Sequence, residues 1–171
     1  MNSRARRAPG ALVLGALGAS AALALAACGF HLEGSTALPR SIALVRIETS
    51  DTESDFYFGL RKALIAAGTR IDESGHDESA TVIHVLNDLT TQRILTVSAL
   101  NVPTEYELSY QLKFSVTAQG RDLIPAETHT LVRDYNFSEN ELLAKERETR
   151  ILNEALAHDL VSVVMRRLSS L

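Results

Sequence analysis

Hydrophobic and polar residues alternate most regularly between positions 105 and 116. Apolar or aromatic side chains occupy the even positions from Tyr106 to Val116, and polar side chains occupy the odd positions from Glu105 to Ser115. Because neighbouring side chains of a strand point to opposite faces, this pattern predicts a half-buried antiparallel strand. One face would pack on a core, and the other would meet water or a ligand.

Three further segments have the composition of strands. Residues 42–47 (IALVRI) form a short β-rich run, and residues 81–97 are rich in β-branched side chains. A last strand is predicted over residues 127–137, after the turn-forming residues Gly120 and Pro125. The acidic, glycine-containing stretch 72–79 between the first two segments is expected to be a loop.

Two segments carry the spacing of amphipathic helices. Thr52 and Asp55 resemble a capping box ahead of residues 56–67, and Gly68 follows as a stop signal. Ser138 and Glu141 form a second capping box, after which apolar residues recur at helical spacing to the C-terminus. About 30 residues at ~1.5 Å each would give a helix of roughly 45 Å, long enough to cross a whole sheet.

The predicted order of elements is therefore β-α-β-β-β-α. The economical arrangement is an α+β fold, a two-layer sandwich with a mainly antiparallel four-stranded sheet and both helices on one face. The chain of 171 residues, with 46% hydrophobic content, suits a single core, and a two-domain enzyme is not expected. The uncovered sheet face would be amphipathic, and binding is the usual reason for such a face.

The first 27 residues have the pattern of an export signal. Arg4, Arg6 and Arg7 precede an uncharged run over residues 11–26, which is shorter than the ~20 residues of a membrane span. The sequence Leu25-Ala26-Ala27-Cys28 then matches a bacterial lipobox. We expect residues 1–27 to be removed and Cys28 to become the lipidated N-terminus of a domain over residues 28–171. The alternatives are a transmembrane anchor, or a free or buried thiol after an ordinary cleavage site.

Lipidation at Cys28 would decide where the protein resides. Several acyl chains, each contributing roughly 0.8 kcal/mol per buried CH₂, anchor a protein stably to a bilayer. Gly29 follows Cys28 where an aspartate would usually signal retention in the inner membrane. The expected location is therefore the periplasmic side of the outer membrane.

The charge of the mature chain excludes one class of function. The whole chain has 17 Lys and Arg against 21 Asp and Glu, and the leader removes three arginines, which leaves 14 against 21, or a net charge of about −7. A nucleic-acid partner is not expected, because neutralising phosphates needs a basic surface.

Catalytic and metal-binding patterns are absent from the sequence. The five histidines are dispersed, the single cysteine is assigned to lipid, and neither a nucleophile elbow nor a phosphate-binding glycine loop occurs. Acid pairs such as Glu105 and Glu107 suit a solvated strand face better than a hydrolase. We therefore expect neither an enzyme nor a metal or other cofactor beyond the covalent lipid.

Several collinear motifs resemble the LptE family of lipopolysaccharide-assembly lipoproteins. They are Cys28-Gly29-Phe30-His31-Leu32, Leu38-Pro39, Tyr106-Glu107-Leu108, Gly120-Arg121-Asp122-Leu123, Arg133-Asp134-Tyr135 and Arg166-Arg167-Leu168. The resemblance implies a non-enzymatic partner of the outer-membrane β-barrel LptD. Such a protein would lie as a plug in the barrel lumen, support barrel assembly, bind lipopolysaccharide and help deliver it to the outer leaflet. The alternative is a periplasm-facing lipoprotein that binds another envelope protein or an amphipathic ligand on its open sheet.

Lipid A phosphates would need cationic donors in the sheet region. The candidates are Arg93, Arg133, Lys113 and Arg121. Arg93 and Arg133 lead this group, because each has apolar neighbours along its strand and a cation beside apolar surface suits an amphipathic lipid.

Overall fold

The computed structural model describes residues 38–136 and 142–171, with side chains described from residue 146 onward in the second range. Cys28, the leader before it and the Ser138/Glu141 pair lie outside the described residues. The elements in chain order are η1 (Arg40–Ile42), β1 (Leu44–Glu48), α2 (Asp55–Ala66), β2 (Arg70–Ile71), β3 (Thr81–Val97), β4 (Pro103–Ala118), β5 (Arg121–Asn136) and α3 (Leu142–Ser169).

Over the described residues the sheet is mixed and has five strands, so the prediction of four strands was wrong in number. Its order is β2-β1-β3-β4-β5; β1 runs parallel to β2 and to β3, whereas β4 runs antiparallel to both β3 and β5. The missed strand β2 contains only Arg70 and Ile71. Two residues show no alternation, and β2 forms because α2 returns the chain beside β1.

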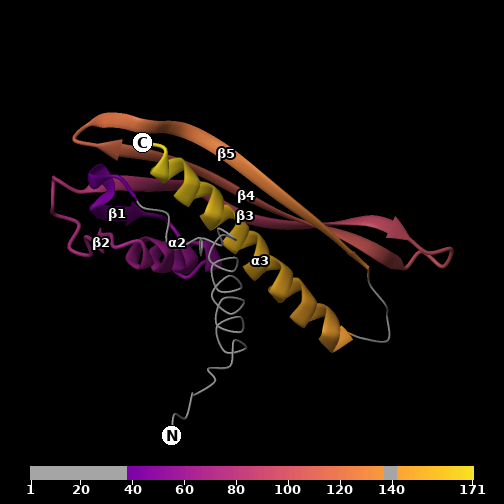
Figure 1. The fold of residues 1–171 in the computed structure, drawn as a ribbon. Coiled ribbons are helices and arrows are strands. Elements are labelled where there is room, and N and C mark those ends of the chain that lie inside the picture. Colours follow the sequence, from indigo (N-terminus) through magenta and orange to yellow (C-terminus); the bar gives the residue numbers. More distant parts are fainter. Residues whose placement is uncertain (1–37, 137–141) are drawn as a thin grey trace, which may run out of the picture. The chain divides into compact units, whose positions relative to one another are not determined.

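Both helices pack on one face of the sheet, as expected (Figure 1). The core lies between the two layers. It is built from alternate residues of β4 and from one side of each helix, namely Leu108, Leu112, Phe114, Val116, Phe56, Leu60, Leu64, Leu156, Leu160, Val164 and Leu168. Ile151, which shares the helical spacing of this set, is instead 55% exposed.

Helix α2 begins two residues later than the predicted capping box. The N-cap is Ser54, whose hydroxyl oxygen accepts a hydrogen bond from the Tyr57 N–H at 3.1 Å. The same hydroxyl donates to Asp88 Oδ2 on β3 at 2.5 Å. The long-range contact with Asp88 favours Ser54 over Thr52, and no local pattern contains it.

Irregularities in β3 and β5 modify the predicted strands. The register between β3 and β4 shifts between Val85 and Asn87, which leaves Leu86 unpaired and 54% exposed. β5 begins at Arg121, six residues earlier than predicted, and continues through Pro125. A proline is tolerated there because β5 is an edge strand.

Candidate functional site

The side of the sheet opposite the helices carries a mostly polar surface, which we call the open face. Residues directly paired across antiparallel strands point to the same side. The pairings therefore place these residues together on the open face: Leu89, Thr91, Arg93, Glu107, Ser109, Gln111, Lys113, Thr128, Thr130, Val132 and Asp134. Leu89 and Val132 are 49% and 47% exposed, so this surface mixes hydroxyl and amide groups with isolated apolar ones.

An exposed apolar segment lies at one end of the open face. Residues 94–106, which we call the distal hairpin, join β3 to β4 and extend past the helices (Figure 1). Ile94, Val97 and Leu100 are 53%, 48% and 87% exposed. The turn itself is ordered, because the Ser98 N–H donates to the Val102 carbonyl at 2.7 Å and Asn101 adopts a left-handed φ of 61°. Exposed apolar side chains at the tip of a hydrogen-bonded hairpin suit contact with an apolar partner.

Arg93 lies on the open face beside the distal hairpin. It donates two hydrogen bonds to Glu107 on β4, at 2.5 Å from Nε to Oε1 and 2.8 Å from Nη2 to Oε2. These bonds hold the pKa of the Glu107 carboxyl below its ordinary value and raise the pKa of Arg93. The side chain of Arg93 is nonetheless 69% exposed, so a phosphate could approach it by competing with Glu107.

Arg133 lies on the helix side of β5. Its cross-strand partner is Leu108, which is buried in the core, and its Nη2 donates to Asp159 Oδ2 of α3 at 3.1 Å. The two predicted leading cations therefore lie on opposite sides of the sheet. Each already has a carboxylate partner.

Lys113 and Arg121 are remote from this pair. Lys113 lies on the open face, six residues along β4 from Glu107, which corresponds to about 20 Å. Arg121 follows the β4–β5 turn at the opposite end of the sheet from the distal hairpin. The structure thus brings Arg93 and Lys113 to one face and does not gather the four cations into one cluster.

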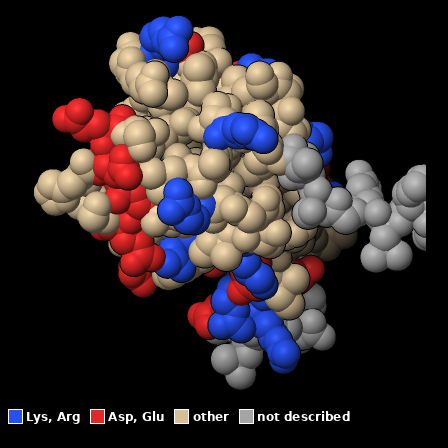
Figure 2. Space-filling model, turned by 60° about the vertical axis from the view of Figure 1, so that its left-hand side comes forward, with Lys and Arg blue, Asp and Glu red and all other residues tan. Residues whose placement is uncertain are grey.

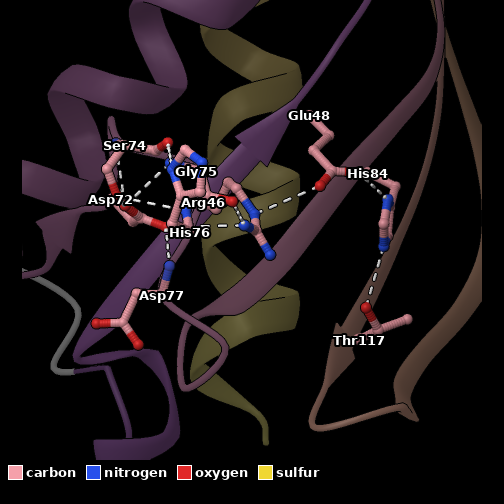
Figure 3. A network of polar contacts seen from close by, with 9 residues as sticks. All are labelled: Arg46, Glu48, Asp72, Ser74, Gly75, His76, Asp77, His84 and Thr117. Carbon is pink, nitrogen blue, oxygen red and sulfur yellow. Dashed lines mark hydrogen bonds and ion pairs between the residues drawn. The ribbon is translucent and has the colours of Figure 1, made fainter.

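The other end of the open face carries a polar network (Figure 3). Arg46 Nε lies 3.4 Å from Glu48 Oε1, and His84 Nδ1 lies 3.0 Å from Glu48 Oε2. His84 Nε2 contacts Thr117 Oγ1 at 3.0 Å. Arg46 also donates to the Gly75 carbonyl. The network therefore ties β1, β3 and β4 to the 72–79 loop.

The conformation of the 72–79 loop is stabilised by hydrogen bonds to the Asp72 carboxylate. Asp72 accepts hydrogen bonds from the backbone and hydroxyl of Ser74 and from the backbone of Gly75 and Asp77 (Figure 3). The Ser74 hydroxyl bond is the main cause that lowers the pKa of Asp72. A cavity of about 580 Å³ lies between this loop and α2 and includes Arg61, Tyr57 and Phe58 in its lining. Its charged groups mostly pair with each other, which suits a structural role.

Sequence reasoning missed a second polar cluster on the helix side of the sheet. Tyr110 is 4% exposed, and its hydroxyl donates to Asp88 Oδ1 at 2.5 Å. Burial and the Asp88 carboxylate together raise the pKa of Tyr110. Asp88 also receives the Ser54 hydroxyl, so it joins the α2 N-terminus to two strands. The alternation pattern marks Tyr110 as a core residue, but it gives no sign of this partner.

The surface is unevenly charged. In Figure 2 acidic side chains gather in a stripe along one side of the view, whereas most Lys and Arg side chains are dispersed. Over the described ranges, there is no group of three His, Cys, Asp or Glu side chains placed to hold a metal ion. In the same part of the chain, no helix has the length and apolar character needed to cross a membrane.

Solved structures of bacterial lipoproteins share this fold. A lipoprotein B from Nitrosomonas europaea, solved by NMR, superposes with a TM-score of 0.67 at 22% identity, covering 83% of this chain and 91% of that one. A minor lipoprotein from Acinetobacter baumannii gives a TM-score of 0.64 at 21% identity, with 77% and 94% coverage. The fold class is therefore the α+β fold seen in these small lipoproteins.

Sequence comparison identifies the family. The family described as "LptE: Lipopolysaccharide-assembly" matches residues 40–168. The LPS-assembly lipoprotein LptE of Pectobacterium atrosepticum is 24% identical over 148 residues, covering 86% of this chain and 80% of that protein. The Yersinia enterocolitica protein of the same name is also 24% identical, over 150 residues, with 86% and 71% coverage. The chain belongs to the LptE family of lipopolysaccharide-assembly lipoproteins.

Proposed function

We propose that this protein is a lipid-anchored partner of an LptD-like β-barrel in the outer membrane. Residues 1–27 act as its export signal, and Cys28 carries the diacylglycerol anchor. The domain plugs the barrel lumen from the periplasmic side, supports barrel assembly and helps deliver lipopolysaccharide to the outer leaflet. It performs no catalysis and needs no cofactor besides the covalent lipid.

The observation that carries this proposal is the family match over residues 40–168. The geometry of the open face supports it. The open face provides the hydroxyl groups of Thr91, Ser109 and Thr130. These groups can replace their hydrogen bonds to water with hydrogen bonds to a polar barrel wall. Such a wall is expected because the interior of a large outer-membrane barrel is polar.

Lipopolysaccharide contact is assigned to the end of the sheet nearest the distal hairpin. Arg93 supplies an exposed guanidinium next to Ile94 and Leu95, which are 53% and 39% exposed. Arg133, whose side chain is 55% exposed, would contact lipopolysaccharide at this same end of the sheet but from the helix side. A phosphate would bind the guanidinium while acyl chains cover the apolar side chains.

The proposal is tested by extracting a C-terminally tagged chain from membranes in mild detergent and identifying the proteins that co-purify. The expected result is a large β-barrel in equimolar amount with the wild type. The Cys28→Ala variant should lose membrane attachment and most of the barrel. Recovery of the wild type alone, or with a soluble periplasmic protein, would contradict the proposal and favour a binding module for another envelope component.

A further inference from the structure

A basic hollow lies at the end of the sheet opposite the distal hairpin. It encloses about 420 Å³ between η1, the start of β3 and the β4–β5 turn. The polar side chains in its lining are Arg40, Ser41, Ser79, Thr81, Gln119 and Arg121. The turn is held by two successive left-handed residues, Gln119 at φ 50° and Gly120 at φ 73°, which fix the start of β5 beside η1.

The charge of this hollow differs from that of the rest of the molecule. Of the described residues that line it, only Arg40 and Arg121 are charged, although the mature chain is expected to be net acidic. Among the described residues neither arginine has an ion-pair partner, in contrast to Arg93 and Arg133. Two unpaired guanidinium groups lining one concave surface favour an anion.

The neighbouring hydrogen bonds define which donors remain available. The Thr81 hydroxyl donates to the Ser41 carbonyl at 2.7 Å, and the Ser79 hydroxyl donates to Asp77 at 2.6 Å. These two groups are therefore engaged within the protein. The guanidinium groups of Arg40 and Arg121, assisted by the Gln119 amide, remain to bind a ligand. Guanidinium donors match the tetrahedral oxygens of a phosphate group.

The position of Arg40 along the chain indicates the source of that phosphate. Arg40 lies twelve positions after the proposed lipid anchor at Cys28, so their Cα atoms are at most about 43 Å apart even when the chain between them is fully extended. Arg40 also opens the first element of the described fold. Because Arg40 also lines the hollow, the described fold begins beside it, at the end of the domain nearest in sequence to the proposed anchor.

We propose that Arg40 and Arg121 bind the headgroup phosphate of an anionic glycerophospholipid in the leaflet that holds the Cys28 anchor. This second contact restricts how the domain is oriented on the membrane. It assigns Arg121 to a site with Arg40, separate from the lipopolysaccharide contact at Arg93. The inference rests on the proposed function, because it requires the lipid anchor.

The test uses the lipidated chain purified in mild detergent. Intact mass spectrometry first establishes the lipid on Cys28, and soluble dihexanoyl phosphatidylglycerol is then titrated while binding is followed by thermophoresis. Saturable binding is expected, and Arg40→Gln combined with Arg121→Gln should weaken it by about tenfold or more. The matched control combines Lys62→Gln with Arg147→Gln, two exposed helix positions with the same change in charge. This control should bind as the wild type does.

Parallel titrations distinguish the sources of phosphate. Dihexanoyl phosphatidylcholine and inorganic phosphate should bind several-fold more weakly than phosphatidylglycerol. Equal binding by the double variant and the wild type would overturn the inference, as would tighter binding of lipopolysaccharide or inorganic phosphate through the same two arginines. A chain without lipid on Cys28 would instead contradict the anchor in the proposed function. Thermal unfolding of each variant verifies that the fold is retained.

Discussion

Asp88 is the residue on which three elements depend. Its carboxylate receives the hydroxyls of Tyr110 from β4 and Ser54 from the α2 N-terminus, and Tyr110 is almost fully buried. Asp88 itself is only partly buried, so a carboxylate that loses this donor keeps part of its desolvation cost, which adds to the value of the lost hydrogen bond. We therefore expect the stability of the fold to depend on the hydroxyl donors to Asp88, in addition to the packing of the apolar core.

Replacing Tyr110 with phenylalanine tests this cluster. The ring still fills its place in the core, but Asp88 loses one donor, and we expect the free energy of unfolding to fall by about 1–3 kcal/mol. Chemical denaturation monitored by circular dichroism measures the change. Tyr57→Phe is the matched control, because the described structure contains no hydrogen bond from the Tyr57 hydroxyl and its effect should stay within about 0.5 kcal/mol. Equal effects of the two substitutions would contradict this role of Asp88.

Arg93 and Glu107 lead to a prediction about ligand binding. Glu107 engages the Nε and Nη2 donors of Arg93, so it competes with a phosphate for that edge of the guanidinium. We expect Arg93→Gln to weaken lipopolysaccharide binding by about fivefold and Glu107→Gln to strengthen it by a similar factor. A lipopolysaccharide binding assay on the purified chain measures both effects. If the two substitutions change affinity in the same direction, the phosphate contact does not lie at Arg93.

At the scale of elements, the sequence pattern and the structure place the N-cap of α2 at different residues, Thr52 and Ser54. Ser54→Ala removes both the cap for Tyr57 and the donor to Asp88, and we expect it to lower the free energy of unfolding by about 1–2 kcal/mol. Thr52→Ala removes the residue that the capping pattern favoured, and it should have little effect. Thermal and denaturant unfolding of the two variants provide the comparison. A larger loss for Thr52→Ala would show that the helix begins where the local pattern placed it.

The elements that the sequence predicted correctly are those whose burial repeats along the chain. Even positions of β4 from Leu108 to Val116 are buried, as their alternation indicates. Pairing between distant residues could not be predicted in this way: β2 depends on the return of the chain after α2, and Ser54 depends on Asp88. The sequence could likewise identify Arg93 and Arg133 as candidate cations, but it could not show that they lie on opposite faces of the sheet. The face of Arg133 is set by its pairing with Leu108, a residue 25 positions away in the chain.

At the scale of the whole molecule, the binding features are separated along the sheet. The distal hairpin and Arg93 lie at one end, and the basic hollow with Arg40 and Arg121 lies at the other. Between them the open face presents mainly hydroxyl and amide groups. This separation suits a domain that contacts its anchoring leaflet at one end, a polar barrel wall along its face and a glycolipid at the far end.

Photo-crosslinking in intact cells tests whether the open face of the domain lies against the wall of a β-barrel. A benzophenone amino acid is placed at Gln111 or Thr130, two exposed neighbours on the open face, and the products are identified by mass spectrometry. We expect a product joining the chain to a large outer-membrane β-barrel at both positions, and its loss in a Cys28→Ala background. Products that contain only soluble periplasmic proteins, or no barrel at either position, would contradict it.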